Sequence, residues 1–256
     1  MNMTSDTRRE MDRYYHDVIG GEYDRVILDP RQTASDLLFS GHHKILPRDG
    51  HMLDIGCGTG QAICRFVPPA RFTNVTALDH SEGMLNVARR NVRDQGISNV
   101  EFIQTDVLDW LEGKPPQRYD LITAIGFLHH LTEEQIRWVI ERMAGCLADK
   151  GCILIADPLD TAGQTEPPAI SRWNQASLAA TASYSEEPEE PDERPIPVRL
   201  MHDAFAAAGL RIVHHSSSWE IFNHSTQPSW WERLRIRWLY HHGGPGLVNA
   251  WTLARY

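Results

Sequence analysis

The sequence predicts an α/β fold with a doubly wound sheet of seven mostly parallel strands, and two observations lead to that prediction. Between residues 50 and 157, short apolar and β-branched runs alternate with helical patterns, which is typical of parallel strands joined by helices. A glycine-rich turn follows the first of these runs and opens a helix, as in sheets that bind a ligand at the carboxyl ends of their strands.

The elements of this central region can be placed one by one. Strands are expected at 51–55, 74–79, 100–105, 119–125 and 152–156. A helix is expected after residue 131, because Thr132 and Gln135 match a capping box and apolar residues recur at helical spacing after them: Ile136, Val139, Ile140, Met143 and Leu147. Gly151 is expected to end the turn that leads into the fifth strand.

The flanking regions are less regular. Residues 8–39 are expected to form one or two helices, broken near Pro30. Residues 157–197 contain six prolines between Pro158 and Pro195 and an acidic run, so they are interpreted as an excursion from the sheet. A last helix at 197–208 and strands at 210–215 and 247–255 then complete the fold, with a tryptophan-rich stretch at 219–240 between the two strands.

The charge, the apolar content and the cysteines of the chain indicate which classes of protein are favoured. The formal net charge is −9 and 41% of the residues are hydrophobic, so a sizeable core is expected, while a partner with many phosphates is disfavoured. No run of 18 apolar residues predicts a transmembrane segment, and no signal peptide is recognised. The four cysteines form no C-x-x-C pair and no zinc-ligand spacing. A cytoplasmic protein with reduced thiols and no metal is therefore expected.

The most informative segment is the turn at residues 54–60, Asp-Ile-Gly-Cys-Gly-Thr-Gly. Glycines at such a turn let the backbone approach a ligand where a Cβ would clash. A dinucleotide fingerprint would require glycine at position 61, where Gln61 stands. A phosphate-binding P-loop would require Gly-Lys-Ser/Thr after the turn, which is absent as well. Both nucleotide sites are therefore excluded.

Residues 53–60 resemble the first motif of the class I S-adenosylmethionine-dependent methyltransferases, and the resemblance continues over about residues 50–157. It implies a Rossmann-like sheet and S-adenosyl-L-methionine as the cofactor. Asp79, 19 residues after Gly60, is the residue implied to accept hydrogen bonds from the ribose hydroxyls. Asp106 is implied to receive the adenine amino group. The implied cofactor-binding set is Asp54, Gly56, Cys57, Gly58, Asp79, His80, Met84, Asp106, Val107, Ile125 and Gly126.

Each of these residues also has a purely structural interpretation. Asp54 can brace the turn, Asp79 and Asp106 can cap helices, and Met84 can belong to the core. The order of four motifs at successive strand ends favours the cofactor interpretation for the set as a whole.

His129 and His130 follow the fourth strand and are the candidate catalytic residues. A histidine near its ordinary pKa of about 6.5 can take a proton from a phenol or an amine at the transition state. The alternative is that one of them caps the next helix and the other bonds the backbone. The residues alone do not choose between the two histidines.

The resemblance also implies a single domain over residues 1–256. Its parts are an N-terminal helical lid at 1–45, a cofactor-binding core at 46–157, a substrate-cap insertion at 158–197 and a C-terminal part at 198–256. Tyrosines and arginines of the lid are candidates to meet the methionine carboxylate: Tyr14, Tyr15, Tyr23, Arg25 and Arg31. Trp173 and Tyr184 are candidates to roof the acceptor pocket. The tryptophan-rich stretch is interpreted as domain packing, a wall for a hydrophobic substrate, a homodimer contact or a membrane-touching surface.

The leading functional hypothesis is methyl transfer to oxygen, nitrogen or carbon of a small-molecule metabolite. The alternative is a cofactor-binding protein of the same fold with non-methylating chemistry or a regulatory role. A nucleic-acid methyltransferase is disfavoured by the acidic charge and because Gly126-Phe127-Leu128 stands where an Asn/Asp-Pro-Pro-Tyr-like motif would be required.

Overall fold

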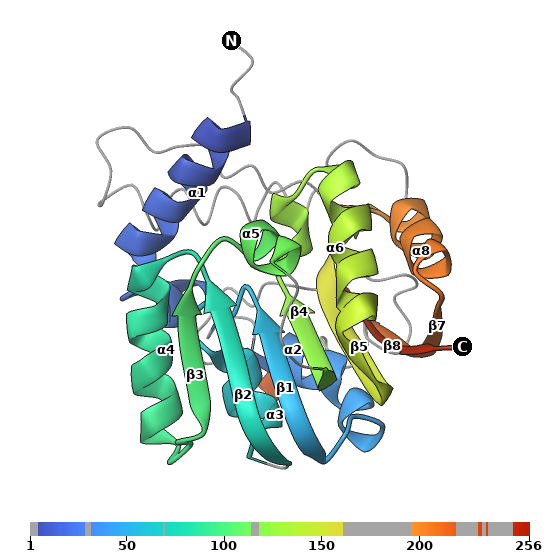
Figure 1. Cartoon of the computed structure of the whole chain (residues 1–256). Coiled ribbons are helices and arrows are strands. Elements are labelled where there is room, and N and C mark those ends of the chain that lie inside the picture. The colour runs from blue at the N-terminus through green and yellow to red at the C-terminus, as the bar shows by residue number, and fades with distance from the viewer. Residues whose placement is uncertain are drawn as a thin grey trace.

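A sheet with the strand order β3-β2-β1-β4-β5-β8-β7 forms the centre of this computed structural model (Figure 1). The structure describes residues 5–28, 32–68, 70–113, 118–160, 196–218, 230–231, 234 and 248–256. Its strands are β1 (Asp49–Ile55), β2 (Arg71–Asp79), β3 (Val100–Gln104), β4 (Tyr119–Ile125), β5 (Leu147–Asp160), β6 (Ile196–Pro197), β7 (Leu210–Ser218) and β8 (Val248–Arg255).

The first five strands run parallel, and β8 lies antiparallel to both β5 and β7. The short β6 pairs with β5 outside the main path. The chain leaves β1 toward β2 on one side and later returns to place β4 on the other. Strand order therefore reverses between β1 and β4, which is the position where open α/β sheets bind their ligands. The predicted seven-stranded, mostly parallel sheet is confirmed.

The helices cover both faces of the sheet (Figure 1). Side chains of α2, α3 and α4 pack on one face, and those of α5, α6 and α8 pack on the other. The bounds are α1 (Ser5–Ile19), α2 (Gln32–Phe39), α3 (Gln61–Phe66), α4 (Glu82–Asp94), α5 (Val107–Glu112), α6 (Glu133–Cys146) and α8 (Val198–Ala207). Short helical turns η1 (Asp24–Leu28), η3 (His42–Lys44) and η4 (Leu128–His130) complete the described elements.

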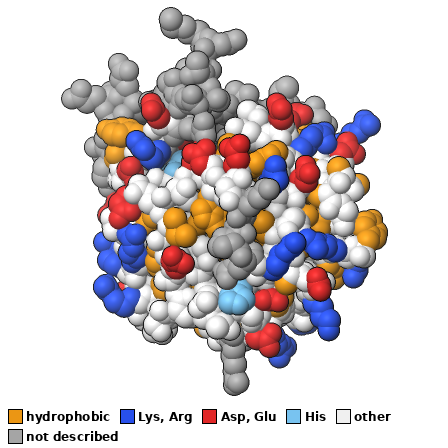
Figure 2. Space-filling model, in the orientation of Figure 1, with side chains coloured by type: hydrophobic (Ala, Val, Ile, Leu, Met, Phe, Trp, Pro, Cys, Tyr) orange, Lys and Arg blue, Asp and Glu red, His pale blue; other side chains and the backbone are white. Residues whose placement is uncertain are grey.

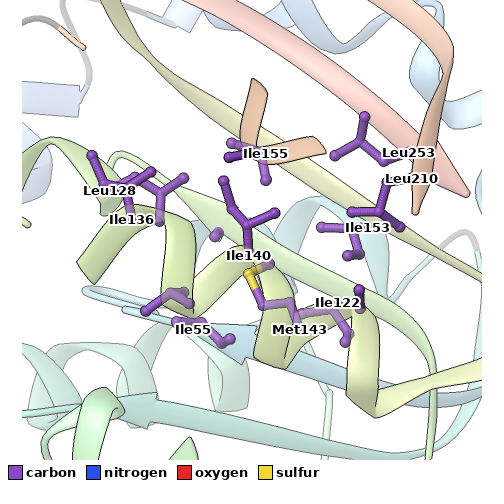
Figure 3. Close-up of a cluster of buried hydrophobic side chains, with 14 of the residues drawn as sticks. Ile55, Ile122, Leu128, Ile136, Ile140, Met143, Ile153, Ile155, Leu210 and Leu253 are labelled. Carbon is purple, nitrogen blue, oxygen red and sulfur yellow. The ribbon is translucent and has the colours of Figure 1, made fainter. Parts of the chain in front are cut away.

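The larger core lies between β4, β5 and the helices α6 and α8. Ile140 and Met143 of α6 point onto Ile122 and Ile153 of the sheet (Figure 3). The stripe arises because α6 presents apolar residues every three or four positions, and the predicted capping box of Thr132 and Gln135 begins the helix. Rigid packing of this kind holds the carboxyl ends of β4 and β5 in place.

The structure differs from the expected boundaries at three places. The first helix already ends at Ile19, because Gly20 and Gly21 follow it, so the helical region has a further interruption besides the expected one near Pro30, where η1 ends at Leu28 and α2 begins at Gln32. Gly151 lies within β5 rather than in a turn, and a Cβ there would stand 2.6 Å from the Tyr119 carbonyl oxygen of the neighbouring strand. β2 begins three residues earlier than expected, at Arg71.

The four cysteines are free and buried. Among the described residues, no helix is both long and apolar enough to cross a bilayer. Pro30, Arg31, Trp173, Tyr184 and most of 219–240 lie outside the described residues. Trp230, Trp231 and Leu234 are described, and their side chains are exposed.

Candidate functional site

The glycine-rich turn joins β1 to α3 in a conformation that requires glycine. Gly56, Gly58 and Gly60 all have positive φ angles, of 63°, 50° and 78°, in the left-handed region that other L-residues enter only at a cost. The Cys57 N–H donates to the Leu78 carbonyl at 2.9 Å and ties the turn to the end of β2.

Replacing Gly56 with alanine is expected to distort the glycine-rich turn and the loop after β4 that it contacts. An added Cβ would lie 2.6 Å from the Phe127 ring of the loop after β4, and the left-handed backbone alone costs about 1–2 kcal/mol for alanine. We expect the free energy of unfolding in urea to fall by at least about 1 kcal/mol. Gly145→Ala is the control, since Gly145 lies in α6 with no atom within 4 Å of its Cβ position. Equal midpoints for Gly56→Ala and the unaltered protein would contradict this account.

Gly58 and Gly126 border open space at the switch point. Both have positive φ, and no atom of the described residues lies within 4 Å of the position where a Cβ would stand on either. Gly58 follows β1 and Gly126 follows β4, so the two glycines belong to neighbouring strand ends. The backbone there can be approached closely by a ligand.

Two carboxylates stand beside this space. Asp79 ends β2 and is buried, and its two oxygens accept the N–H groups of Gly58 at 2.8 Å and Ser81 at 2.9 Å. Asp54 is the penultimate residue of β1 and accepts the Thr123 hydroxyl at 2.5 Å through Oδ1. Its Oδ2 is buried and has no hydrogen-bond partner among the described residues. Burial raises the pKa of Asp54 to about 7, against the lowering effect of the Thr123 hydrogen bond.

His129 is held by a carboxylate that the sequence analysis did not single out. Its Nδ1 lies 2.8 Å from Oδ1 of Asp157 in β5, and both side chains are buried. Asp157 also accepts the N–H groups of Leu128 at 3.4 Å and His129 at 3.3 Å. Burial raises the pKa of Asp157 to about 7, although the backbone hydrogen bonds act in the opposite direction. This contact fixes the orientation of the His129 ring, with Nδ1 toward Asp157.

His130 points instead toward the N-terminal helix. Its Nδ1 lies 3.3 Å from Oδ1 of Asp12, and His80 Nε2 lies 3.4 Å from the other oxygen of that carboxylate. Burial lowers the pKa of His130 to about 3. Although burial alone would raise it, the pKa of Asp12 is lowered by the surrounding histidines, His130 and His16 foremost. His16 belongs to the same group, with Nδ1 3.5 Å from the Asp12 carboxylate. No metal site was expected from the sequence, yet Asp12, His16 and His130 offer three ligand atoms close together.

Two further aspartates attach the N-terminal segment to the site. Asp17 accepts the Ser81 hydroxyl at 2.7 Å and the Gly83 N–H at 2.9 Å. Asp24 accepts the Thr59 hydroxyl of the glycine-rich turn at 2.5 Å. Asp24 also accepts the side-chain amides of Gln61 at 3.1 Å and of Asn91 in α4 at 2.7 Å. The segment therefore contacts the turn directly.

The remaining candidate cofactor-binding residues include a helix cap, buried core residues and a half-buried residue. Asp106 caps α5 by accepting the Leu108 N–H at 2.7 Å, and Val107 beside it is buried. Met84 is buried against Ile19 of α1, as its core interpretation describes. Ile125, at the end of β4, is half-buried.

The N-terminal candidates for the methionine carboxylate are placed differently. Arg25 pairs with Glu22, and Tyr14 is exposed. Tyr15 and Tyr23 pack against the Met84–Ile19 pair.

Sequence reasoning missed Asp12, Asp17, Asp24 and Asp157. For Asp157 a signal was present, since it directly follows the apolar strand 152–156 and so stands at the carboxyl edge of the sheet. The other three lie in a helical region where an aspartate is ordinarily a solvated residue. Apart from His16, which lies four residues after Asp12, the partners of these three aspartates are separated from them by 35 to 118 positions along the chain.

The central part of the chain is similar in sequence to known methyltransferases. Residues 53–153 match a family model described as a methyltransferase domain. The chain is 23% identical over 205 residues to a malonyl-[acyl-carrier protein] O-methyltransferase of Paenibacillus sp. (strain JDR-2), covering 79% of this chain and 71% of that one. It is 28% identical over 149 residues to a trans-aconitate 2-methyltransferase of Acidovorax sp. (strain JS42), covering 56% of this chain and half of that enzyme.

Solved structures share the fold. A DhpI–SAM–HEP complex superposes with a TM-score of 0.64 at 20% identity, over 98% of this chain and all of that one. The O-methyltransferase NcsB1 from neocarzinostatin biosynthesis, solved with S-adenosylmethionine and a naphthoic acid, gives 0.58 at 15% identity, over 96% of this chain and 61% of that one. Residues 53–153 are thus similar in sequence to a methyltransferase domain, and the chain shares the fold of these S-adenosylmethionine-binding structures.

Proposed function

We propose that this chain transfers a methyl group from S-adenosylmethionine to an oxygen, nitrogen or carbon atom of a small acceptor molecule, with His129 as the general base. The observation that carries the proposal is the arrangement at one sheet edge. An open glycine-lined space lies beside Asp79 at the end of β2, and a buried pair is formed by His129, after β4, and Asp157, in β5. Cofactor-binding and proton-accepting groups thus belong to one continuous edge of the sheet.

The residues at this edge fit the cofactor. Asp79 faces the turn and, as a carboxylate, has lone pairs beyond the two that already accept N–H groups, so it can receive ribose hydroxyls. Gly58 leaves room for the adenosyl group against the backbone. Oδ2 of Asp54 has no donor among the described residues, and a buried oxygen without one is costly. A cofactor ammonium group can supply that donor. Asp106 and Val107 would border the adenine.

S-adenosylmethionine supplies a methyl group already activated by its sulfonium. The chain must hold the acceptor in line with the methyl–sulfur bond and exclude water, which can contribute several kcal/mol. When bound, the cofactor would supply the methyl group to the acceptor atom through cleavage of its carbon–sulfur bond, with S-adenosylhomocysteine as the neutral leaving group. An ionised Asp157 would accept a hydrogen bond from Nδ1–H of His129, and in that tautomer Nε2 carries the lone pair that can take a proton from the acceptor.

Several features favour a small acceptor. The relatives above are methyltransferases named for malonyl-acyl-carrier protein and trans-aconitate. The net charge is −9, and acidic and basic side chains are interspersed on the face shown in Figure 2. Such a surface gives little attraction to a polyphosphate backbone. We therefore propose a small metabolite rather than a nucleic acid, and a cytoplasmic site of action.

The test has two stages. Calorimetry with S-adenosylmethionine and with S-adenosylhomocysteine measures cofactor binding, and mass spectrometry of a metabolite panel then detects methylated products. The proposal predicts micromolar binding of both compounds and at least one product with a mass increase of one methyl group. Binding without any product across the panel would favour the alternative of non-methylating chemistry. No heat with either compound, from protein shown to be folded by circular dichroism, would overturn the cofactor site itself.

A further inference from the structure

Asp12 stands at the centre of a group of imidazoles contributed by three separate parts of the chain. His16 lies four residues later on the same helix, His130 comes from η4 after β4, and His80 follows β2. α1 lies over the edge at which β2 and β3 end (Figure 1). The group is part-buried, with exposed side-chain fractions of 15% for His16 and 24% for His130.

The distances from the Asp12 carboxylate to two imidazoles match those between the ligands of a metal site. His130 Nδ1 and His16 Nδ1 lie 3.3 Å and 3.5 Å from Oδ1 of Asp12. Zinc–ligand bonds are about 2.0–2.1 Å, so ligand atoms around a tetrahedral ion lie about 3.4 Å apart. One ligand atom from each of the three residues falls within 4.8 Å of the other two. Two imidazoles and one carboxylate form the ligand set that divalent transition metals use when one position is left for water or substrate.

We propose that Asp12, His16 and His130 form a binding site for a divalent transition cation of the zinc class. Asp12 and His16 share one helical face because they are four residues apart. In the structure His16 Nδ1 lies 2.9 Å from the Asp12 backbone carbonyl, and binding exchanges that hydrogen bond for coordination by the neutral ring. His80, 3.4 Å from the second carboxylate oxygen, orients Asp12 from outside the ligand set.

The site would connect the N-terminal helix to the catalytic edge. Asp12 and His130 are 118 residues apart, and the His130 ring centroid lies 4.0 Å from that of His129. A cation at this position therefore holds α1 against the loop that carries His129. The proposal does not depend on methyl transfer, because cation binding is measured by itself.

The test uses the full chain after treatment with a chelator and dialysis. Calorimetry with Zn²⁺ and with Mg²⁺ should show one Zn²⁺ site and much weaker Mg²⁺ binding, since imidazole ligands favour the softer cation. Asp12→Asn, His16→Ala and His130→Ala should each weaken Zn²⁺ binding by at least about 100-fold, and His80→Ala by about 10–100-fold. His202→Ala, on the exposed face of α8, is the matched control and should leave binding unchanged.

A spectroscopic measurement keeps the test independent of whether each variant folds. Co²⁺ added to the unaltered chain should produce visible absorption bands of a tetrahedral or five-coordinate ion, and equimolar Zn²⁺ should abolish them. Absence of these bands together with absence of Zn²⁺ heat would overturn the proposal. So would Zn²⁺ binding of equal strength in the His202→Ala and His130→Ala proteins, when circular dichroism shows that both are folded.

Discussion

Asp79→Ala is expected to weaken binding of S-adenosylhomocysteine by roughly 10²–10⁴-fold. Hydrogen bonds to a charged group contribute about 1.5–3 kcal/mol each, and loss of two ribose contacts at about 1.4 kcal/mol per factor of ten gives that range. The substitution also frees the Gly58 and Ser81 N–H groups, which Asp79 holds at 2.8 and 2.9 Å. The measurement is isothermal calorimetry with S-adenosylhomocysteine, a ligand that cannot react.

Asp109→Ala serves as the matched control for this experiment. Asp109 is an exposed aspartate in the first helical turn of α5. Its removal changes the net charge by the same amount as the loss of Asp79 and leaves the contacts of the glycine-rich turn in place. The control should bind with unchanged affinity. If Asp79→Ala and Asp109→Ala bind equally well, Asp79 has only a structural role at the end of β2, and the proposed ribose contacts are wrong.

The second large effect is expected from the His129–Asp157 pair. His129→Gln should lower kcat by about 10²–10⁴-fold, the range that a positioned general base contributes. Asp157→Asn should lower kcat to a similar extent. An asparagine side chain has nearly the same shape as aspartate, but its amide can favour the tautomer of His129 that does not act as a base. Neither substitution removes a group assigned to the cofactor, so the affinity for S-adenosylhomocysteine should stay within a few-fold.

The pH profile separates catalysis from packing. Burial raises the pKa of Asp157 to about 7. Below that pH the His129–Asp157 pair holds one more proton, and the pair must lose that proton before His129 can act as a base. The rate should therefore rise with pH through about 7, as a property of the coupled pair, and Asp157→Asn should remove this rise. His130→Gln is the comparison variant, and a larger loss of kcat there than in His129→Gln would identify His130 as the base instead.

Much of the sheet could be predicted because its signals are local. Each of these signals is contained within a few consecutive residues: the apolar runs of β1, β3 and β4, and the capping box that begins at Thr132. The turn at Gly56–Gly60 was informative for the same reason, since positive φ requires particular residues at particular positions. Where the local signal was ambiguous, as at Gly151, close contact with Tyr119 on the neighbouring strand decided the outcome.

The site contacts could not be predicted to the same depth, because they join distant segments. Nothing near Asp12 indicates His130, and the Asp24–Thr59 hydrogen bond depends on how η1 folds back over the turn. The choice between His129 and His130 illustrates the difference. Their sequence environment is shared, whereas in the structure one ring meets buried Asp157 and the other meets Asp12 of α1.

The contacts of Asp17 and Asp24 have a kinetic consequence. These two residues hold the N-terminal segment to Gly83, where Gly20 packs so closely that a Cβ would not fit, and to Thr59 of the turn. Coupling between two sites is reciprocal, so a molecule that orders the turn also favours the attached position of the segment. We propose that the reaction product leaves only after the segment has detached from the turn. Turnover is then expected to follow the rate of that detachment, as it does in many enzymes whose product release is gated by a loop.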